Sequence, residues 1–327
     1  MADQIGSTPR IVFMGTPEFA VPSLKALSGL FDVVGVYAQP PRRQGRGMKE
    51  KPSAVHAQAD ALGLCIYTPT QFNDDDIRQL AELAPDFLVV VAYGMILPQA
   101  VLDIPAVMPI NGHASLLPRW RGAAPIHRAI AAQDDETGIT TMKMEAGLDT
   151  GPMLMMEKTA INADDDTGSL HDRLAMITAD LLVKTINSIG DIQPVSQDDD
   201  QVTYAGKITP DEAEIDFTQT AQVIDARLRA FRPFPGSWIA LGKADNGKIT
   251  RLKVSDINLV SAQLGEAGSV LGAGPNGGPL VACCDGAVEL TKVQPQGKPS
   301  MSGQDFLNGN TLPEQILKAD DIVLERV

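Results

Sequence analysis

An asparagine and a histidine two positions apart are the first residues that could act together on a substrate. Asn111 and His113 flank a glycine in the segment Ile110-Asn-Gly-His-Ala-Ser115. On an extended segment, side chains two residues apart leave the same face. The amide donates fixed N–H groups and the imidazole offers a proton near neutral pH, so both can stabilise a carbonyl oxygen that becomes an oxyanion. The pair predicts chemistry at a carbonyl carbon.

A carboxylate, Asp149, is the third candidate catalytic residue. It lies in residues 145–152, where glycines and a proline mark a loop at strand ends. Open α/β sheets bind their ligands at such loops. A carboxylate beside His113 would orient the imidazole and take a proton from an attacking amine, directly or through water. His127 and His171 lie on helical patterns, where a structural role is favoured.

The elements that must position these residues alternate between apolar runs and helical patterns. Arg10–Gly15, Asp32–Tyr37 and Asp86–Val91 read as buried strands, with a helical stretch near Lys51–Leu62. Strands that alternate with helices predict a Rossmann-like parallel sheet with helices on both faces. Two further strands and a long helix with apolar residues at helical spacing then follow.

The turn after the first strand gives two further expectations. Thr16, Pro17 and Glu18 carry the signals of a helix start, with a threonine cap and proline in the first turn. The turn lacks the G-x-G-x-x-G spacing that brings backbone close to a dinucleotide, so NAD is discounted.

A polar segment around residues 190–208 predicts a linker between two domains, 1–208 and 209–327. After it, an amphipathic helix with Ile224 and Leu228 on one face precedes short strands separated by turn signals. Several short strands within about 60 residues indicate a small all-β barrel that resembles an OB-fold. The expected strands are Gly236–Leu241, Thr250–Val260, Gly268–Leu271, Pro279–Cys284 and Ala287–Val293.

Ordered motifs along nearly the whole chain resemble those of the folate-dependent formyltransferases. One such motif would be weak evidence, but the set at family spacing is specific. The motifs are Val12-Phe-Met-Gly15-Thr-Pro, Gln39-Pro, Gly45-Arg-Gly47, Val90-Val-Ala-Tyr-Gly94, Asn111-x-His113, Ser115-Leu-Leu-Pro118, Arg119-Trp-Arg-Gly-Ala-Ala-Pro125, Asp149-Thr-Gly151, and Arg229-Ala-Phe with Pro233-Phe-Pro235.

The resemblance implies a reaction and its site. The formyl group would pass from N10 of 10-formyltetrahydrofolate to the α-amino group of methionine esterified to initiator tRNA, the step that prepares the initiator for translation. Asn111, His113 and Asp149 would be the catalytic residues, without a metal. The turn formed by Ser115, Leu116, Leu117 and Pro118 would contact the folate.

Charge is the feature that fits a tRNA substrate least, because the chain carries a net charge of −14. Binding must therefore rely on local basic patches. The best patch is the glycine-flanked segment 40–51, for which the resemblance implies insertion at the acceptor stem; its basic residues include Arg42, Arg43, Arg46 and Lys49. A second strip is possible at Arg227, Arg229 and Arg232, although arginines on an amphipathic helix are often only its solvent face.

Three alternative functions stay open at this point. The same site could formylate an amino-sugar nucleotide or glycinamide ribonucleotide, or hydrolyse the formyl-folate with water as acceptor. A non-enzymatic tRNA-binding module would need only the barrel and the basic segment. The complete set of Asn111, His113 and Asp149 argues against that last alternative.

The number of cysteines and the length of the apolar runs predict the cellular compartment. Three cysteines cannot form a disulfide framework, which favours a reducing cytoplasm. No apolar run reaches the roughly 20 residues that span a bilayer, and Met1–Pro9 does not read as a secretion leader. We therefore expect a cytoplasmic protein. The resemblance implies a bacterial enzyme, and we expect it to be a monomer.

Overall fold

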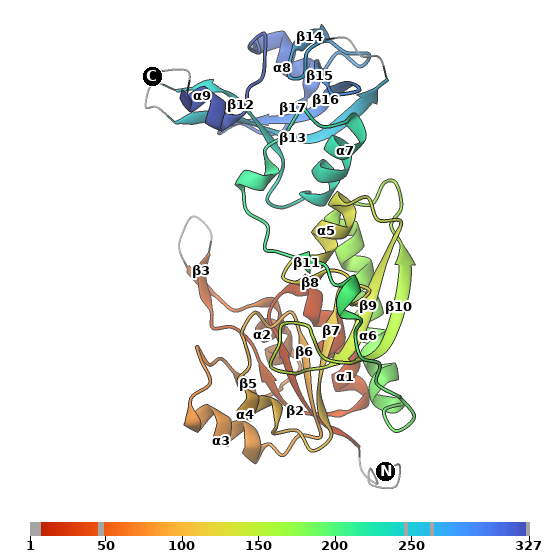
Figure 1. Cartoon of the computed structure of the whole chain (residues 1–327). Helices are drawn as coiled ribbons and strands as arrows, with labels where there is room; N and C mark the ends of the chain where they lie inside the picture. Colours follow the sequence, from red (N-terminus) through yellow and green to blue (C-terminus); the bar gives the residue numbers. More distant parts are fainter. Residues whose placement is uncertain (1–7, 45–48, 245–247, 262–264, 325–327) are drawn as a thin grey trace. The chain divides into compact units, whose positions relative to one another are not determined.

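The chain folds into two compact units in a computed structural model (Figure 1), which describes residues 8–44, 49–244, 248–261 and 265–324. The first unit takes Met1–Pro125, Glu136–Ala160 and Ser169–Gly206. The second takes Ile126–Asp135, Ile161–Gly168 and Lys207–Val327. The change from one unit to the other after residue 206 falls within the polar segment expected to be the linker.

A seven-stranded sheet of order β10-β9-β7-β6-β1-β2-β5 is the frame of the first unit (Figure 1). The five strands from β7 to β5 pair in parallel, as predicted, and β9 and β10 extend the sheet in antiparallel fashion. The strands are β1 (Arg10–Gly15), β2 (Asp32–Tyr37), β5 (Ile66–Tyr67), β6 (Phe87–Val91), β7 (Met108–His113), β9 (Glu136–Lys143) and β10 (Met153–Ala160).

Helices cover both faces of this sheet, which explains why its central strands are continuous apolar runs. On one face, Val12 and Leu88 form a core cluster with Leu80 of α3 and Val101 of α4. On the other face, α6 packs so closely on β7 that a Cβ at Gly112 would lie 2.8 Å from Cγ2 of Thr178. The helices of this unit are α1 (Val21–Leu30), α2 (Ala54–Ala61), α3 (Asp74–Glu82), α4 (Gln99–Leu102) and most of α6 (Thr167–Asn187), whereas α5 (Pro125–Ala131) lies almost wholly in the second unit.

The start of the first helix differs from the expectation. A 3₁₀ turn, η1 (Glu18–Ala20), precedes α1, and no side chain caps it. The hydroxyl of Thr16 instead donates to the carbonyl of Tyr93 at 2.7 Å and accepts from the backbone N–H of Gln39 at 3.3 Å. The predicted threonine cap is therefore wrong, because carbonyl and N–H groups from neighbouring strand ends take the hydroxyl.

Two segments read as irregular from the sequence contain strands. β3 (Arg42–Gln44) and β4 (Lys49–Lys51) form an antiparallel hairpin within the basic segment. In the expected linker, β11 (Tyr204–Ala205) pairs in parallel with β8 (Arg121–Gly122). A short 3₁₀ turn, η2 (Asp199–Gln201), precedes β11. The linker segment is thus hydrogen-bonded into the first unit.

An antiparallel sheet of order β12-β13-β16-β15-β14 forms the second unit, with β17 paired to β16. The prediction of a second domain built from a series of strands is confirmed, with α8 and α9 in addition to the one helix that was expected. Ile224 and Leu228 of the expected amphipathic helix pack into its core. The elements are η3 (Asp211–Ala213), α7 (Ala221–Ala230), β12 (Trp238–Lys243), β13 (Ile249–Val260), β14 (Val270–Ala273), β15 (Pro279–Cys283), β16 (Gly286–Pro295), β17 (Met301–Ser302), α8 (Gly303–Gly309) and α9 (Ala319–Leu324).

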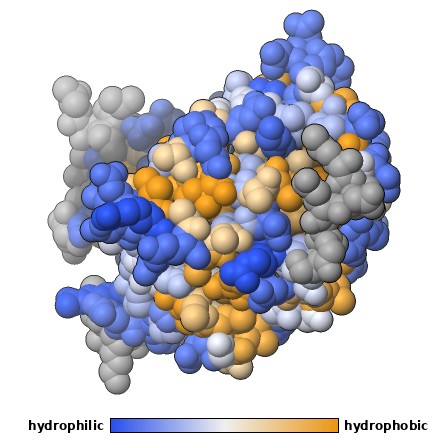
Figure 2. Space-filling model, turned by 90° about the horizontal axis from the view of Figure 1, so that it is seen from below, coloured by the Kyte–Doolittle hydropathy of each residue, from blue (hydrophilic) through white to orange (hydrophobic). Residues whose placement is uncertain are grey.

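Hydrophobic and hydrophilic side chains are interspersed on the face drawn in Figure 2, where apolar patches are separated by hydrophilic ones. Apolar atoms make up much of any folded protein's surface, so such patches need no special function. Within the described parts of the chain, none of the helices combines the length and the apolar character needed to span a bilayer.

A fully buried carboxylate, Glu289, stabilises a turn in the second unit. It accepts from the backbone N–H groups of Asn276 at 2.7 Å and Gly278 at 2.9 Å, and from the Asn276 amide at 2.9 Å. Burial raises the pKa of Glu289, but these hydrogen bonds outweigh burial and hold its pKa below the usual range. The charged form is therefore the one that stabilises the fold.

Replacing this carboxylate should weaken the second unit and change its acid stability. Glu289→Gln should cost about 1 to 3 kcal/mol of unfolding free energy at neutral pH, because buried donors lose a charged acceptor. The pKa of Glu289 is lower in the folded chain than its ordinary value of 4.5, so the charged side chain stabilises the folded state at pH values above 4.5. This stabilisation is lost as the pH falls through the lower pKa of the folded state. Urea unfolding measured from pH 7 to pH 3 should show that the unfolding free energy of the variant falls less on acidification than that of the wild type.

The exposed Glu314 offers a matched control in the same unit. Glu314→Gln should leave both the unfolding free energy and its pH dependence near those of the wild type. Equal curves for Glu289→Gln and the wild type would contradict the assigned role of Glu289.

Candidate active site

Strand β7 carries Asn111 and His113 at its carboxyl end, in the middle of the sheet. Asn111 lies opposite Val90 of β6 and Met142 of β9. Gly112 between them faces α6, and alternate residues of a strand face opposite sides. Asn111 and His113 therefore share the face away from α6, as their spacing predicted.

The carboxylate of Asp149 lies between these two side chains. Its Oδ1 is 3.4 Å from the amide nitrogen of Asn111, and its Oδ2 is 3.6 Å from Nδ1 of His113. The backbone N–H of Gly122 donates to Oδ2 at 2.8 Å. The side chains of His113 and Asp149 are only 6% and 10% exposed. The structure thus brings the three predicted residues together in a largely water-excluded place, where electrostatic interactions are strong.

The imidazole of His113 is anchored at its far side. Its Nε2 lies 2.9 Å from the carbonyl oxygen of Trp120, which only accepts hydrogen bonds, so Nε2 carries a proton. Trp120 has a φ of 63°, and its own N–H donates to the hydroxyl of Thr203 at 2.9 Å. This left-handed backbone aims the carbonyl at the ring. Nδ1 is therefore the ring nitrogen that faces Asp149.

Two polar residues, the half-buried Gln197 and the buried Arg121, support the loop of Asp149. Neither of them was predicted to have a role in the site, although Arg121 lies within the motif Arg119–Pro125. The Gln197 amide donates to the carbonyl oxygens of Asp149 and Gly151, each at 2.8 Å. Nε of Arg121 donates to the Gln197 side-chain oxygen at 2.9 Å. Gln197 lies in the polar segment read as a linker, where nothing in its local pattern marks a role.

The turn expected to contact folate is held mainly by internal bonds. The Ser115 hydroxyl donates to the carbonyl of Arg119 at 2.6 Å, and the Leu117 N–H donates to the Thr140 hydroxyl at 3.1 Å. Ser115 and Leu117 are buried, whereas Leu116 and Pro118 are partly exposed. Any direct folate contact by side chains of this turn therefore falls to Leu116 and Pro118.

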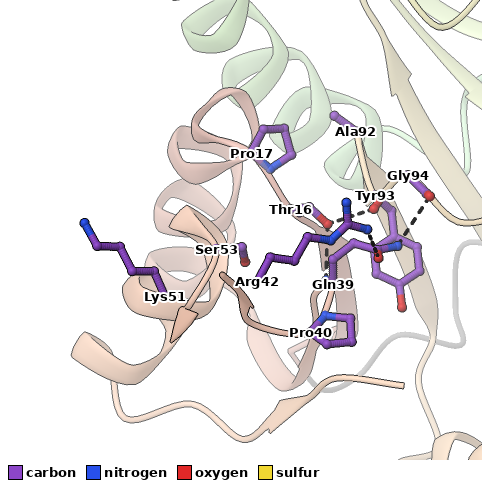
Figure 3. A pocket seen from close by; sticks show the side chains of 10 residues that line it. All are labelled: Thr16, Pro17, Gln39, Pro40, Arg42, Lys51, Ser53, Ala92, Tyr93 and Gly94. Atoms are coloured by element: carbon purple, nitrogen blue, oxygen red, sulfur yellow. Dashed lines mark hydrogen bonds between the residues drawn. The ribbon is translucent and has the colours of Figure 1, made fainter. Parts of the chain in front are cut away.

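A pocket of about 290 Å³ opens at the same edge of the sheet (Figure 3). Thr16, Gln39 and Tyr93 to Gly94 line it where β1, β2 and β6 end. The Thr16 hydroxyl bonds described above tie these three strand ends together. Chain order reverses between β1 and β6, and the crevice at such a switch point is where α/β sheets bind ligands.

The hairpin of β3 and β4 adds positive charge to this pocket. Arg42 and Lys51 are paired across the hairpin, so they share one face, and both line the pocket. The Arg42 guanidinium donates to the side-chain oxygen of Gln39 at 3.1 Å, while Lys51 extends outward (Figure 3). Arg43 and Glu50 occupy the opposite face and form an exposed ion pair at 4.0 Å.

The other two predicted tRNA contacts are less defined. Arg46 lies outside the described residues, and Lys49 begins β4 with a side chain that is likewise outside them. The second basic strip is not supported by the structure of its unit. Arg227 donates to the carbonyl of Glu212 at 2.7 Å, Arg229 pairs with Asp225 at 2.8 Å, and Arg232 pairs with Asp256 at 3.4 Å. These arginines stabilise the second unit through its own carbonyls and carboxylates.

The described parts of the chain hold no group of three or more His, Cys, Asp or Glu side chains placed to bind a metal ion. The polar side chains of Asn111, His113 and Asp149 contact each other and the backbone of Trp120 and Gly122. What the arrangement can do chemically is to donate hydrogen bonds to a developing oxyanion and accept a proton beside it.

Comparison with known proteins places this chain in one enzyme family. Residues 9–186 match the model of the formyl transferase family, and residues 207–311 match the model of the formyl transferase C-terminal domain. The chain belongs to the formyl transferase family.

Curated relatives within this family carry a more particular name. A methionyl-tRNA formyltransferase of Jannaschia sp. is 50% identical over 302 residues, 92% of this chain and 96% of the relative. One of Cereibacter sphaeroides is 48% identical over 305 residues, 93% of this chain and 97% of the relative. The fold also resembles an N-formyltransferase from Helicobacter canadensis, solved with folinic acid and dTDP-3-aminofucose. The TM-score is 0.62 at 19% identity, over 87% of this chain and 99% of that one.

Proposed function

We propose that this formyl transferase moves the formyl group of 10-formyltetrahydrofolate to the α-amino group of methionine on initiator tRNA. The observation that carries the proposal is the buried Asp149 carboxylate beside Asn111 and His113, in a chain that matches methionyl-tRNA formyltransferases over more than 90% of its length. Both family domains are present, including the C-terminal one.

In the proposed reaction, the amine nitrogen forms a bond to the formyl carbon, and the bond from that carbon to N10 then breaks. The amide of Asn111 uses one N–H toward Asp149 and has a second for the carbonyl oxygen as it becomes an oxyanion. Asp149 accepts the proton that the amine loses, directly or through water, and N10 gains a proton as it leaves.

His113 contributes through Nδ1. At 3.6 Å this nitrogen lies beyond a normal hydrogen bond to Asp149, so Nδ1 is open to contact a substrate oxygen. The bond from Nε2 to the Trp120 carbonyl keeps the ring in place meanwhile. Catalytic contacts of this kind often tighten only when substrate is bound.

The folate would bind against apolar surface next to Asp149. Leu148 directly precedes Asp149 and is 65% exposed, and Ile96, in the loop after β6, is 89% exposed. Large apolar side chains at such exposure are suited to cover a flat aromatic ring. Together with Leu116 and Pro118, which the resemblance implied, they are our candidates for folate contacts. Nothing in the sequence pattern marked Leu148 or Ile96.

The acceptor end of the tRNA would enter through the pocket beside the hairpin. β1 lies two strands from β7, so the pocket is about 10 Å from the strand that carries Asn111. Arg42 and Lys51 provide positive charge there, and Ser53 provides a hydroxyl group. A phosphate near this pocket would leave room for an esterified amino acid to extend to the catalytic residues.

The acceptor assay tests the proposed function. The purified enzyme is given 10-formyltetrahydrofolate with methionine charged on initiator tRNA, methionine charged on elongator tRNA, free methionine, a dTDP-amino-sugar or no acceptor. We expect formylation confined to the initiator-charged tRNA. Turnover only with the amino-sugar would identify a sugar N-formyltransferase, and tetrahydrofolate release without acceptor would identify a hydrolase.

The catalytic assignment predicts large losses at two residues. Asn111→Ala and His113→Ala should each lower kcat by at least about 10²-fold, because each removes a donor to the oxyanion. Single-turnover formylation measures the loss, and thermal unfolding checks that the fold is kept. His171→Ala, on α6, is the matched control and should stay near the wild-type rate. A near wild-type rate for either site variant would remove it from the mechanism.

The hairpin geometry predicts that the adjacent residues Arg42 and Arg43 contribute unequally to tRNA binding. Arg42→Ala should raise the KM for charged tRNA by about 10-fold or more, because it removes a charge-assisted bond at the pocket. It should also reduce the slope of log affinity against log salt by about 1. Arg43→Ala should have a smaller effect, because Glu50 already offsets its charge. Equal effects of the two variants would contradict this placement of the acceptor end.

A further inference from the structure

We propose that Gln197 is a positioning residue for the reaction and holds the Asp149 carboxylate in its reactive geometry, with Arg121 fixing the orientation of the Gln197 amide. This inference rests on the proposed function of Asp149. It assigns a role in the chemistry to the polar segment between the two domains.

Strand register brings Gln197 to this loop. Met153 and Val195 form an antiparallel bridge, with N···O distances of 2.8 and 2.9 Å in the two directions. In an antiparallel pair, a step of two residues forward in one strand matches a step of two residues back in the other, so residue 197 lies opposite residue 151. The start of β10 therefore aligns Gln197 with the end of the Asp149 loop.

The loop needs such support because Asp149 has a φ of 54°, a backbone conformation that residues with a Cβ rarely adopt. Gly151 has no room for a side chain, since a Cβ there would overlap the carbonyl oxygen of Lys143. Gln197 uses both of its amide hydrogens on this loop, one on the Asp149 carbonyl and one on the Gly151 carbonyl. These two bonds hold the left-handed turn from which the carboxylate projects.

Arg121 determines which way the amide points. A glutamine amide can present its oxygen or its nitrogen to a neighbour, and Nε of Arg121 accepts no hydrogen bond, so the oxygen must face it. The arginine side chain is 5% exposed, and its guanidinium also reaches Asp199 at 3.4 Å. The Gln197 nitrogen is thereby directed to the two loop carbonyls.

The same short strand fixes the carboxylate from the other side. Arg121 and Gly122 form β8, and the Gly122 N–H donates to Asp149 Oδ2 at 2.8 Å. A Cβ at Gly122 would lie 2.8 Å from the Ala205 carbonyl, so the close pairing with β11 excludes one. Asp149 is thus held at its backbone by Gln197 and at its carboxylate by β8, and Gln197 acts on the reaction through Asp149 alone.

Steady-state formylation of Met-initiator tRNA by the full chain tests the inference. Gln197→Ala should lower kcat by about 10²-fold, the usual effect of misplacing a catalytic group by 1 Å. The KM values for tRNA and for 10-formyltetrahydrofolate should change little. Gln197→Glu keeps an acceptor for Arg121 but turns a second oxygen toward the carbonyls, so it should be at least as impaired.

Gln201→Ala is the matched control, because Gln201 lies in the same segment and its amide donates only to the nearby Asp198 carboxylate, at 2.7 Å. It should behave as the wild type. Thermal unfolding of all three variants shows whether a loss of activity reflects a loss of fold.

A double-mutant cycle with Asp149→Asn separates positioning from a general structural role. If Gln197 acts through the carboxylate, Gln197→Ala should cost little in the Asp149→Asn background, measured by single turnover with excess enzyme. A structural role would give the same loss in both backgrounds. An equal loss in both backgrounds would overturn the inference. It would also be overturned if Gln197→Ala kept a kcat within a few-fold of the wild type, or changed only a KM. A wild-type enzyme that does not formylate Met-tRNA would instead overturn the proposed function.

Discussion

A nearly buried carboxylate is the constraint on which the first unit depends. A charge removed from water is tolerated only when donors replace the lost hydration. Asp149 obtains its donors from separate parts of the chain: the Asn111 amide on β7 and the Gly122 N–H on β8. His113 then faces the same carboxylate from β7. The sheet, the short parallel pair and the loop must therefore all be formed before the site exists.

The catalytic residues and the pocket both lie at the carboxyl edge of the parallel sheet. The end of β7 carries the chemistry, and the ends of the neighbouring strand β6 and of β1 and β2 beyond it form a pocket. Thr16 joins those strand ends through one hydroxyl, which is why it does not serve as a helix cap. A rigid edge of this kind suits a substrate that must span from its phosphate to its amine.

The acidic character of the chain and a tRNA substrate are compatible when charge is considered locally. The arginines around α7 are engaged by carbonyls and carboxylates of their own unit. On the hairpin, strand alternation separates Arg42 and Lys51 from the Arg43–Glu50 pair. At physiological salt, charges are screened beyond about 8 Å, so distant acidic surface hardly affects a phosphate at this pocket.

The sequence by itself determined the strands β1, β2 and β6, the helices α2, α6 and α7, and the shared face of Asn111 and His113, because periodicity and turn residues are local properties of the chain. It also indicated that Asp149 lies in a loop at strand ends. Only the tertiary structure decided that the supposed linker supplies Gln197, that Arg121 orients it, and that Thr16 pairs with Tyr93. Gln197 lies 48 residues from Asp149, and Thr16 lies 77 from Tyr93. Such contacts depend on how strands are ordered and registered in space, and no local pattern encodes them.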